Sequence, residues 1–248
     1  MRVLQVGLLC LSFCAARPMA ADLLPSDPTQ AALLERFLAR DEPALTSYSG
    51  TRCLAASNDR FHAAGAMEVA VILTPGRGLE GSILREDGSG YIRSKVLKKA
   101  LEGERDLIAR GEPARAALSL DNYEIAVHAA ADAAGGTGVG TARLQLLPRR
   151  KDMLLVRGSV LITDPEADIL EVQGQLAKTP SWWTTKVDVM RTYGRVAGVR
   201  VPVAMSSTAQ VRMVGRSHFR MTSTFERVNG RSTGATAPAI ACAAGAES

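Results

Sequence analysis

The residues best suited to catalysis in this sequence are its three histidines, and their positions argue against a shared site. His62, His128 and His218 lie in separate segments, and none of them forms an HExxH motif. No serine lies in a G-x-S-x-G turn, the strand-to-helix elbow that presents a nucleophile. We therefore expect no catalytic residue, no metal site and no cofactor. A protein that is not an enzyme is the leading interpretation, and a hydrolase with unrecognised residues is an alternative.

Two further motifs resemble ligand sites but predict loops. The segment GGTGVG at 135–140 has the composition of a phosphate loop, yet it leads into TARLQL at 141–146, which reads as a strand and not as a helix. Asp164, Glu166 and Asp168 alternate like calcium ligands, but the glycine and the terminal glutamate of a calcium loop are missing. The sequence predicts a flexible hairpin loop at the first motif and a turn at the second.

The cysteines and tryptophans could hold or present parts of the fold. Cys53 and Cys242 are the two cysteines that remain if the leader is removed, and they could form a disulfide that ties the tail to the first strand segment. Two unpaired thiols are the other interpretation. Trp182 and Trp183 are adjacent at a predicted hairpin corner, where one ring should face the core and the other should face outward.

The N-terminus reads as a secretory leader. A charged start is followed by about eleven apolar residues and then by small residues, which predicts a signal peptide over 1–20. The apolar stretch is shorter than the roughly 20 residues that cross a bilayer, so we expect a soluble mature chain. We expect one domain over 21–230 and a flexible tail over 231–248.

Composition excludes several classes of protein. The chain has 248 residues, 46% hydrophobic and 22% charged, which argues against a disordered chain and a polytopic membrane protein. The net charge of +5 includes Arg2 and Arg17 of the leader, so the mature chain is less basic and a nucleic-acid partner is not expected. Only 4% of residues are aromatic, so the core must consist mainly of aliphatic side chains and methionine.

Two amphipathic helices are predicted. The first starts at Asp27 and Pro28 and ends before Pro43. The second spans 89–110, with Ser89 as its cap and Gly111 at its end. The second helix is rich in lysine and arginine, which indicates a solvated face; a membrane surface or an acidic partner is the alternative.

Most other segments alternate between apolar and polar residues and are joined by short turns, which predicts an antiparallel meander of about nine strands. At roughly 4.8 Å per strand, such a sheet is about 43 Å wide, and two helices cover about half of its apolar face. The sheet must either curl into a filled barrel or leave an apolar face for a ligand. Gly158 and Gly174 interrupt the apolar pattern and favour a cavity. The fold class is therefore α+β: an incomplete antiparallel β-barrel with two helices over its open side.

The predicted lining of the cavity consists of strand residues on the expected inner face. These residues are Val160, Ile162, Leu170, Val172, Leu176, Val187, Val189, Val201, Val203, Met205, Phe219 and Met221. With few rings in the chain, such a lining suits a flexible acyl chain better than a flat aromatic ligand.

Several runs of the sequence resemble a known family. They are LLPRRKD at 146–152, Gly158, DILEVQGQLAKTPSWW at 168–183, GVRVPV at 198–203, VNG at 228–230, YSGTR at 48–52 and NY at 122–123. Together they resemble the bacterial proteins described as outer-membrane lipoprotein-sorting protein-like, a group similar to LolA, LolB and RseB.

The resemblance implies an incomplete barrel, lidded by helices, that holds acyl chains in the periplasm of a Gram-negative bacterium. The expected partners are a lipid or an acylated lipoprotein and a transport protein of the inner or outer membrane, and the expected state is a monomer. The alternative function is a non-enzymatic interaction module that docks a partner through the basic helix 89–110.

Overall fold

The structure is a computed structural model, and it describes residues 28–111, 113–128, 140–234 and 242. The predicted signal peptide, Asp27 and most of the glycine-rich segment at 135–140 lie outside the described residues.

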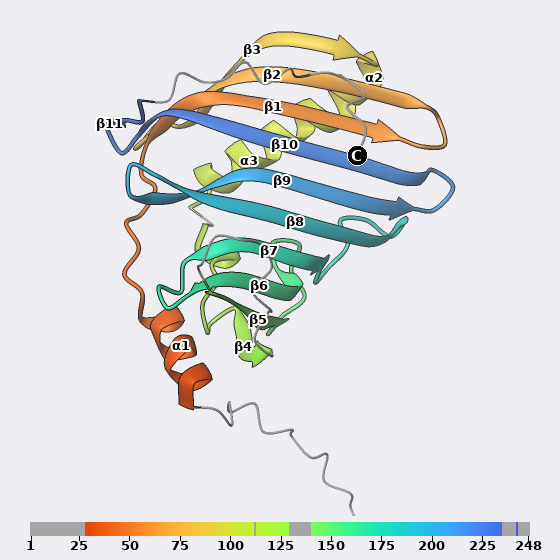
Figure 1. Cartoon of the computed structure of the whole chain (residues 1–248). Coiled ribbons are helices and arrows are strands. Elements are labelled where there is room, and N and C mark those ends of the chain that lie inside the picture. The colour runs from red at the N-terminus through yellow and green to blue at the C-terminus, as the bar shows by residue number, and fades with distance from the viewer. Residues whose placement is uncertain (1–27, 112, 129–139, 235–241, 243–248) are drawn as a thin grey trace, which may run out of the picture.

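One antiparallel sheet of eleven strands forms the body of the protein (Figure 1). Its strand order is β3-β2-β1-β10-β9-β8-β7-β6-β5-β4, and β11 pairs with β10. The strands are β1 (Tyr48–Asn58), β2 (Ala63–Thr74), β3 (Gly78–Gly88), β4 (Tyr123–His128), β5 (Gly140–Pro148), β6 (Val156–Asp164), β7 (Ile169–Leu176), β8 (Thr184–Val196), β9 (Val199–Val211), β10 (Gly215–Val228) and β11 (Arg231–Ser232). The sheet is strongly curved and does not close, so the predicted incomplete barrel is confirmed.

Two helical regions accompany the sheet. The first is α1 (Pro28–Ala39), and the second runs without interruption through α2 (Gly90–Ile92), the π-helical η1 (Arg93–Leu97) and α3 (Lys98–Ala109). The Ser89 hydroxyl accepts a hydrogen bond from the Ile92 amide, as an N-cap should, and Gly111 ends the helix with a φ of 66°. A 3₁₀ turn, η2 (Pro113–Ala116), follows. Among the described residues, none of the helices combines the length and apolar character needed to cross a membrane.

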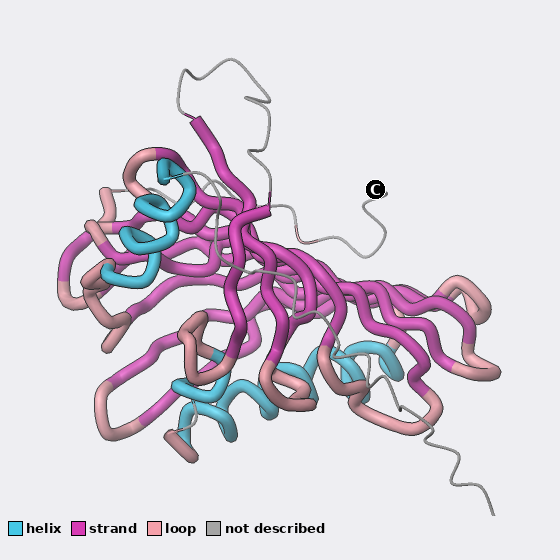
Figure 2. The backbone as a smooth tube through the Cα atoms, turned by 90° about the horizontal axis from the view of Figure 1, so that it is seen from below, coloured by secondary structure: helices cyan, strands magenta, loops and turns pink. Residues whose placement is uncertain are grey.

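The apolar interior is divided between the two ends of the sheet. Under β4 to β7, α1 inserts Leu33 and Phe37 among fully buried residues such as Leu144 and Val160. Under β1 to β3, the second helical region contributes Ile92 and Leu97 to another buried cluster. In Figure 2 the long helical region lies along one side of the curved sheet. Each helical region therefore covers one end of the sheet, and β8 to β10 lie between them.

The glycines Gly158 of β6 and Gly174 of β7 lie where two strands approach closely. Gly158 lies opposite Gly174, and a Cβ atom on Gly158 would lie 2.0 Å from the carbonyl oxygen of Gln173. The two glycines thus allow two backbones to approach closely. Both glycines also line a pocket of about 480 Å³, together with residues of β8 and β9.

The C-terminal part is held to the sheet at two places. Arg231 and Ser232 form β11 at the start of the segment predicted as tail. Cys242 forms a disulfide with Cys53 of β1, with a Cα–Cα distance of 5.4 Å. The disulfide joins residues that are 189 positions apart in the chain.

Candidate binding groove under helix α3

A groove runs between α3 and the inner face of the sheet, over parts of β1, β10, β9 and β8. Its inner pocket has a volume of about 370 Å³. The pocket is lined by Leu54, Ala100, Leu101, Gly103, Glu104, Leu107, Leu154, Arg191, Tyr193, Pro202, Met205, Phe219 and Met221. A second pocket of about 800 Å³ shares Glu104 and Pro202 with it and extends toward Leu45, Leu73 and Ile108. The two pockets therefore adjoin beneath the same helix.

The floor of the inner pocket follows from the register of the sheet. Leu54 of β1 pairs with Met221 of β10, Met221 pairs with Met205 of β9, and Met205 pairs with Arg191 of β8. Side chains in such a cross-strand row share one face of the sheet. Met205 and Met221 are only half-buried, unlike the fully packed residues at either end of the sheet. The middle of the sheet thus presents flexible apolar side chains that lack complete packing partners.

A polar tether joins α3 to the sheet at the point where the two pockets meet. The Arg52 guanidinium donates to both carboxylate oxygens of Glu104, one at 3.0 Å, and also to the Tyr48 hydroxyl. Arg52 is only 4% exposed, so its charge depends on this partner. Burial alone would lower the pKa of Arg52, but Glu104 and Tyr48 outweigh burial and raise it. Burial also raises the pKa of Tyr48 to about 12, so the hydroxyl stays neutral at physiological pH.

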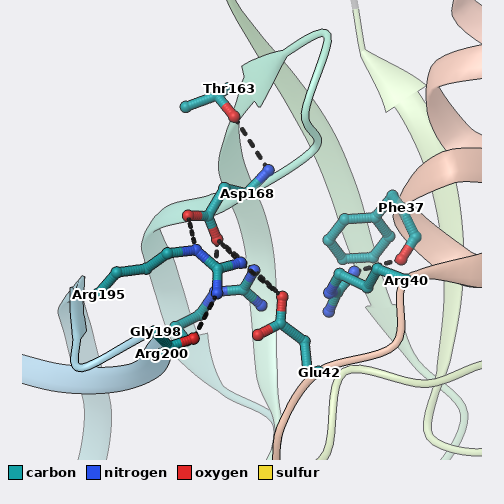
Figure 3. Close-up of polar contacts among 8 residues, drawn as sticks. All are labelled: Phe37, Arg40, Glu42, Thr163, Asp168, Arg195, Gly198 and Arg200. Atoms are coloured by element: carbon teal, nitrogen blue, oxygen red, sulfur yellow. Dashed lines mark hydrogen bonds and ion pairs between the residues drawn. The ribbon is translucent and has the colours of Figure 1, made fainter.

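A second polar cluster fixes the chain between α1 and β1 (Figure 3). Asp168 accepts hydrogen bonds from Arg195 at 2.7 Å and from Arg200, and both arginines also donate to Glu42. Burial opposes ionisation of Asp168, but the two arginines hold the pKa of its carboxyl below its usual value. Arg40 lies beside the cluster, and burial together with Arg200 lowers its pKa to about 10. Asp168, in the turn predicted from the acidic trio, therefore serves as an ion-pair partner.

The predicted lining residues divide between the groove and the two packed cores. Met205, Phe219 and Met221 line the inner pocket. Val160, Ile162 and Val172 are buried in the core with α1, and Leu176 packs against that core. Val201 is buried in the other core, and Val203 packs against it. Val187 and Val189 are buried but belong to neither core.

Leu170 departs from the predicted inner face because of a β-bulge. The register of β6 and β7 skips Leu170, so Ile169 pairs with Ile162 and is buried in its place. Leu170 is half-exposed. A bulge leaves no trace in an alternating pattern, which is why the sequence did not distinguish the two residues.

Several residues of the groove were not predicted. Leu54 and the helix residues Leu101 and Leu107 carried a signal, because each lies on an apolar face of its own element. Arg191 and Pro202 carried none, since a charged residue and a proline do not indicate an inner face.

The remaining candidate residues lie outside the groove. His218 contacts Asp59, with a nitrogen–oxygen distance of 3.3 Å, and His62 lies in the exposed β1–β2 turn. His128 ends β4, and its side chain is not described. The prediction that one tryptophan faces the core is wrong, because Trp182 and Trp183 are both exposed and stack on each other with ring centroids 3.7 Å apart. Thr184 takes the buried position at this corner.

The basic helix is partly neutralised within the chain. Lys98 lies 3.0 Å and Arg93 lies 3.1 Å from Glu86 of β3, and Lys99 pairs with Glu102. These pairs reduce the charge that the helix offers to an acidic partner.

Comparison with known proteins gives a likeness of fold. No family model matches the sequence, and no curated protein matches it. The chain is similar to a solved LolA superfamily protein from Nitrosomonas europaea, with 8% identity and a TM-score of 0.36 over 79% of this chain and 91% of that chain. It is also similar to a structure described as an outer membrane lipoprotein-sorting protein domain from Vibrio parahaemolyticus, with 10% identity and a TM-score of 0.39 over 80% and 92% of the two chains.

A third similar structure is a DUF1329 family protein from Desulfovibrio piger, with 7% identity and a TM-score of 0.35 over 80% and 92% of the two chains. At these scores the likeness concerns the fold alone, and the function has to be argued from the groove.

Proposed function

We propose that this protein is a non-enzymatic carrier or sensor that binds lipid or lipoprotein acyl chains in the groove under α3, and that it acts in the periplasm. The observation that carries the proposal is the apolar floor of the inner pocket beneath an amphipathic helix, where Met205, Phe219 and Met221 are half-buried and lie beside the buried Leu54. A volume of about 370 Å³ lies within the range of small-molecule sites, and the adjoining pocket lengthens the path. We expect the protein to work as a monomer that meets a transport partner at a membrane.

Apolar burial would supply the affinity. Each buried methylene contributes about 0.8 kcal/mol, so one long acyl chain is held usefully even after ordering costs are subtracted. The methionines in the floor can change rotamer to follow the shape of a flexible chain. Among the described residues that line the inner pocket, Glu104 and Arg191 alone are charged, which suits a ligand whose polar end stays outside.

We propose that α3 moves away from the sheet when a ligand enters. Glu104 is on α3 and Arg52 is on β1, so their ion pair has to open or shift when the groove widens. The π-helical turn η1 precedes α3, and π turns of this kind occur often at functional positions in helices. The groove therefore has one wall that is held by a polar tether and not by complete apolar packing.

Filling the groove tests the proposal. Met221→Trp places a large ring over the inner pocket and should abolish saturable binding of a fluorescent fatty acid, measured by titration of the purified mature protein. Met190→Trp is the matched control, because Met190 is exposed and lies outside the inner pocket. Urea unfolding of both variants checks that each is folded.

Native lipid gives a second measurement. The wild-type protein should yield lipid on solvent extraction and mass spectrometry, and Met221→Trp should yield much less. If the wild type shows neither extracted lipid nor saturable fluorescence, or if both tryptophan variants bind equally, the groove is not an acyl-chain site.

A further inference from the structure

The turns that connect the strands on one side of the sheet carry exposed aromatic and apolar side chains that belong to neither core. The β1–β2 turn, the β9–β10 turn and the β7–β8 connection lie on the same side of the sheet (Figure 1). The first carries Phe61, the second Met213 and the third Trp182 and Trp183, all exposed. Their exposed fractions are 62%, 79%, 70% and 46%. We call these four residues the aromatic rim.

Hydrogen bonds to main-chain carbonyl oxygens join the three turns. The Arg60 guanidinium donates to the Met213 carbonyl oxygen at 2.6 Å, which joins the β1–β2 and β9–β10 turns. The Arg212 amide donates to the Trp183 carbonyl oxygen at 2.8 Å, which joins the β9–β10 turn to the β7–β8 connection. The rim is therefore one surface held by the fold, and its side chains extend from a fixed frame.

The charges around the rim are mainly positive. The segments 59–62, 177–183 and 212–216 contain Arg60, Lys178, Arg212 and Arg216, and their one acidic residue, Asp59, pairs with His218. All four basic residues are exposed. Tryptophan with lysine and arginine is the combination found where proteins meet the interface of an anionic membrane.

The turns at the other ends of the strands have a different composition. The turns at 75–77, 165–168, 197–198 and 229–230 contribute none of the large exposed apolar residues found among the described parts of the chain. The asymmetry gives the molecule an apolar, basic end and a polar end.

We infer that the aromatic rim docks the protein on the surface of an anionic lipid bilayer, with the rings of Trp182 and Trp183 in the headgroup region and the basic residues against lipid phosphates. The rim lies outside both pockets under α3, so this inference is independent of acyl-chain binding in the groove.

The chain provides its own probe for the inference. Trp182 and Trp183 are its only tryptophans, so intrinsic tryptophan fluorescence reports on the rim alone. Mixed with protein-free vesicles of phosphatidylcholine and phosphatidylglycerol, the wild type should shift its emission to shorter wavelength, and brominated acyl chains should quench it. Vesicles of phosphatidylcholine alone should give a much smaller effect.

Variants separate the aromatic and ionic parts. Trp182→Ser/Trp183→Ser should lose cosedimentation with the anionic vesicles, while Ile83→Ser/Leu84→Ser, an exposed apolar pair on β3, should keep it. Lys178→Glu/Arg212→Glu should retain both tryptophans and bind at least about tenfold more weakly. The main-chain contacts between the turns remain in all of these variants.

Three results would overturn the inference: unchanged tryptophan emission at high vesicle concentration, equal loss of binding in the β3 control, or self-association. In the last case the wild type stays unbound to vesicles but sediments as a dimer that Trp182→Ser/Trp183→Ser dissociates, and the rim is then an interface between copies of this chain. Binding of a soluble fatty acid probe to the groove is measured separately, so either proposal can fail without the other.

Discussion

Single charged residues hold distant parts of this chain in place. Asp168 lies in the β6–β7 turn, yet it binds Arg195 and Arg200 of the β8–β9 hairpin, which also bind Glu42 in the segment between α1 and β1. Through the two arginines, the carboxylate links the β6–β7 turn, the β8–β9 hairpin and the segment between α1 and β1, which are far apart in sequence. Ion pairs in such networks contribute more than isolated surface pairs, because each charge has several partners.

Asp168→Asn should lower the free energy of unfolding by about 1–2 kcal/mol, since the variant loses charge-assisted hydrogen bonds that are partly screened by solvent. The pKa of Asp168 is lowered from a value of 3.8, so its stabilising effect is present above that pH and is lost as the pH falls through the folded-state pKa. Urea unfolding of both proteins should therefore show a difference that is constant near neutral pH and that shrinks below about pH 4.

Asp188→Asn is the control for this prediction, because Asp188 is a half-buried strand residue that pairs with Lys186 and lies outside the Asp168 cluster. An equal loss of stability in the two variants, or a difference that grows on acidification, would contradict the role assigned to Asp168.

At the scale of elements, α3 forms the helical wall of the groove and packs only partly against the sheet. None of its residues is fully buried, although Leu101 and Ile108 pack against the core under β1 to β3. The pair Arg52–Glu104 supplies a contact between this helix and the sheet. Local opening of such an element costs less than global unfolding.

Glu104→Gln should loosen α3 by leaving the buried Arg52 without an anionic partner. We expect a loss of about 2 kcal/mol, equivalent to roughly thirtyfold faster hydrogen exchange in the amides of α3. Mass spectrometry of peptides from 98–109 measures it. Glu102→Gln alters an exposed pair on the same helix and should leave exchange unchanged. Equal exchange in the two variants would show that the tether does not hold the helix.

The sequence predicts elements well where side-chain pattern and capping agree. Ser89 and Gly111 mark the ends of the second helical region as expected, and alternation identifies strands such as β8 and β9. The strand β3 gives no comparable signal, because almost all of its residues are exposed and its stability comes from pairing with β2. Pairing of this kind depends on tertiary structure and leaves no periodic pattern.

The groove is harder to predict than the sheet for the same reason. Alternation shows which residues share a face, and Met205, Phe219 and Met221 were found in this way. It does not show which part of that face a helix covers, so Val160 and Ile162 could not be distinguished from them, although α1 packs over that part of the sheet. The positions of α1 and α3 along the sheet are set by contacts between segments far apart in sequence.

At the scale of the whole molecule, the disulfide joins the first strand to a residue near the C-terminus. Cys242 is buried, and its sulfur lies 3.4 Å from the carbonyl oxygen of Met67 in β2. A cross-link over 189 positions removes much conformational freedom from the unfolded chain.

Cys53→Ser/Cys242→Ser should therefore lower the free energy of unfolding by about 2–4 kcal/mol, as measured in urea. Dithiothreitol should lower the stability of the wild type by a similar amount and leave the double variant unaffected. Equal stability of the oxidised and reduced wild type would show that the cross-link contributes nothing to the fold.

The order of strands in the sheet constrains how the chain can fold as it is made. The meander β1 to β3 is complete by residue 88, yet the partner on the other side of β1 is β10, close to the end. Until β10 emerges, β1 has an open backbone edge, which is a surface for mispairing with other chains. Pairing β1 with β10 then requires contacts between residues far apart in the sequence, and such contacts form slowly. The two halves of the sheet become one structure only with the last long strand, so truncation before residue 215 leaves β1 without its β10 neighbour.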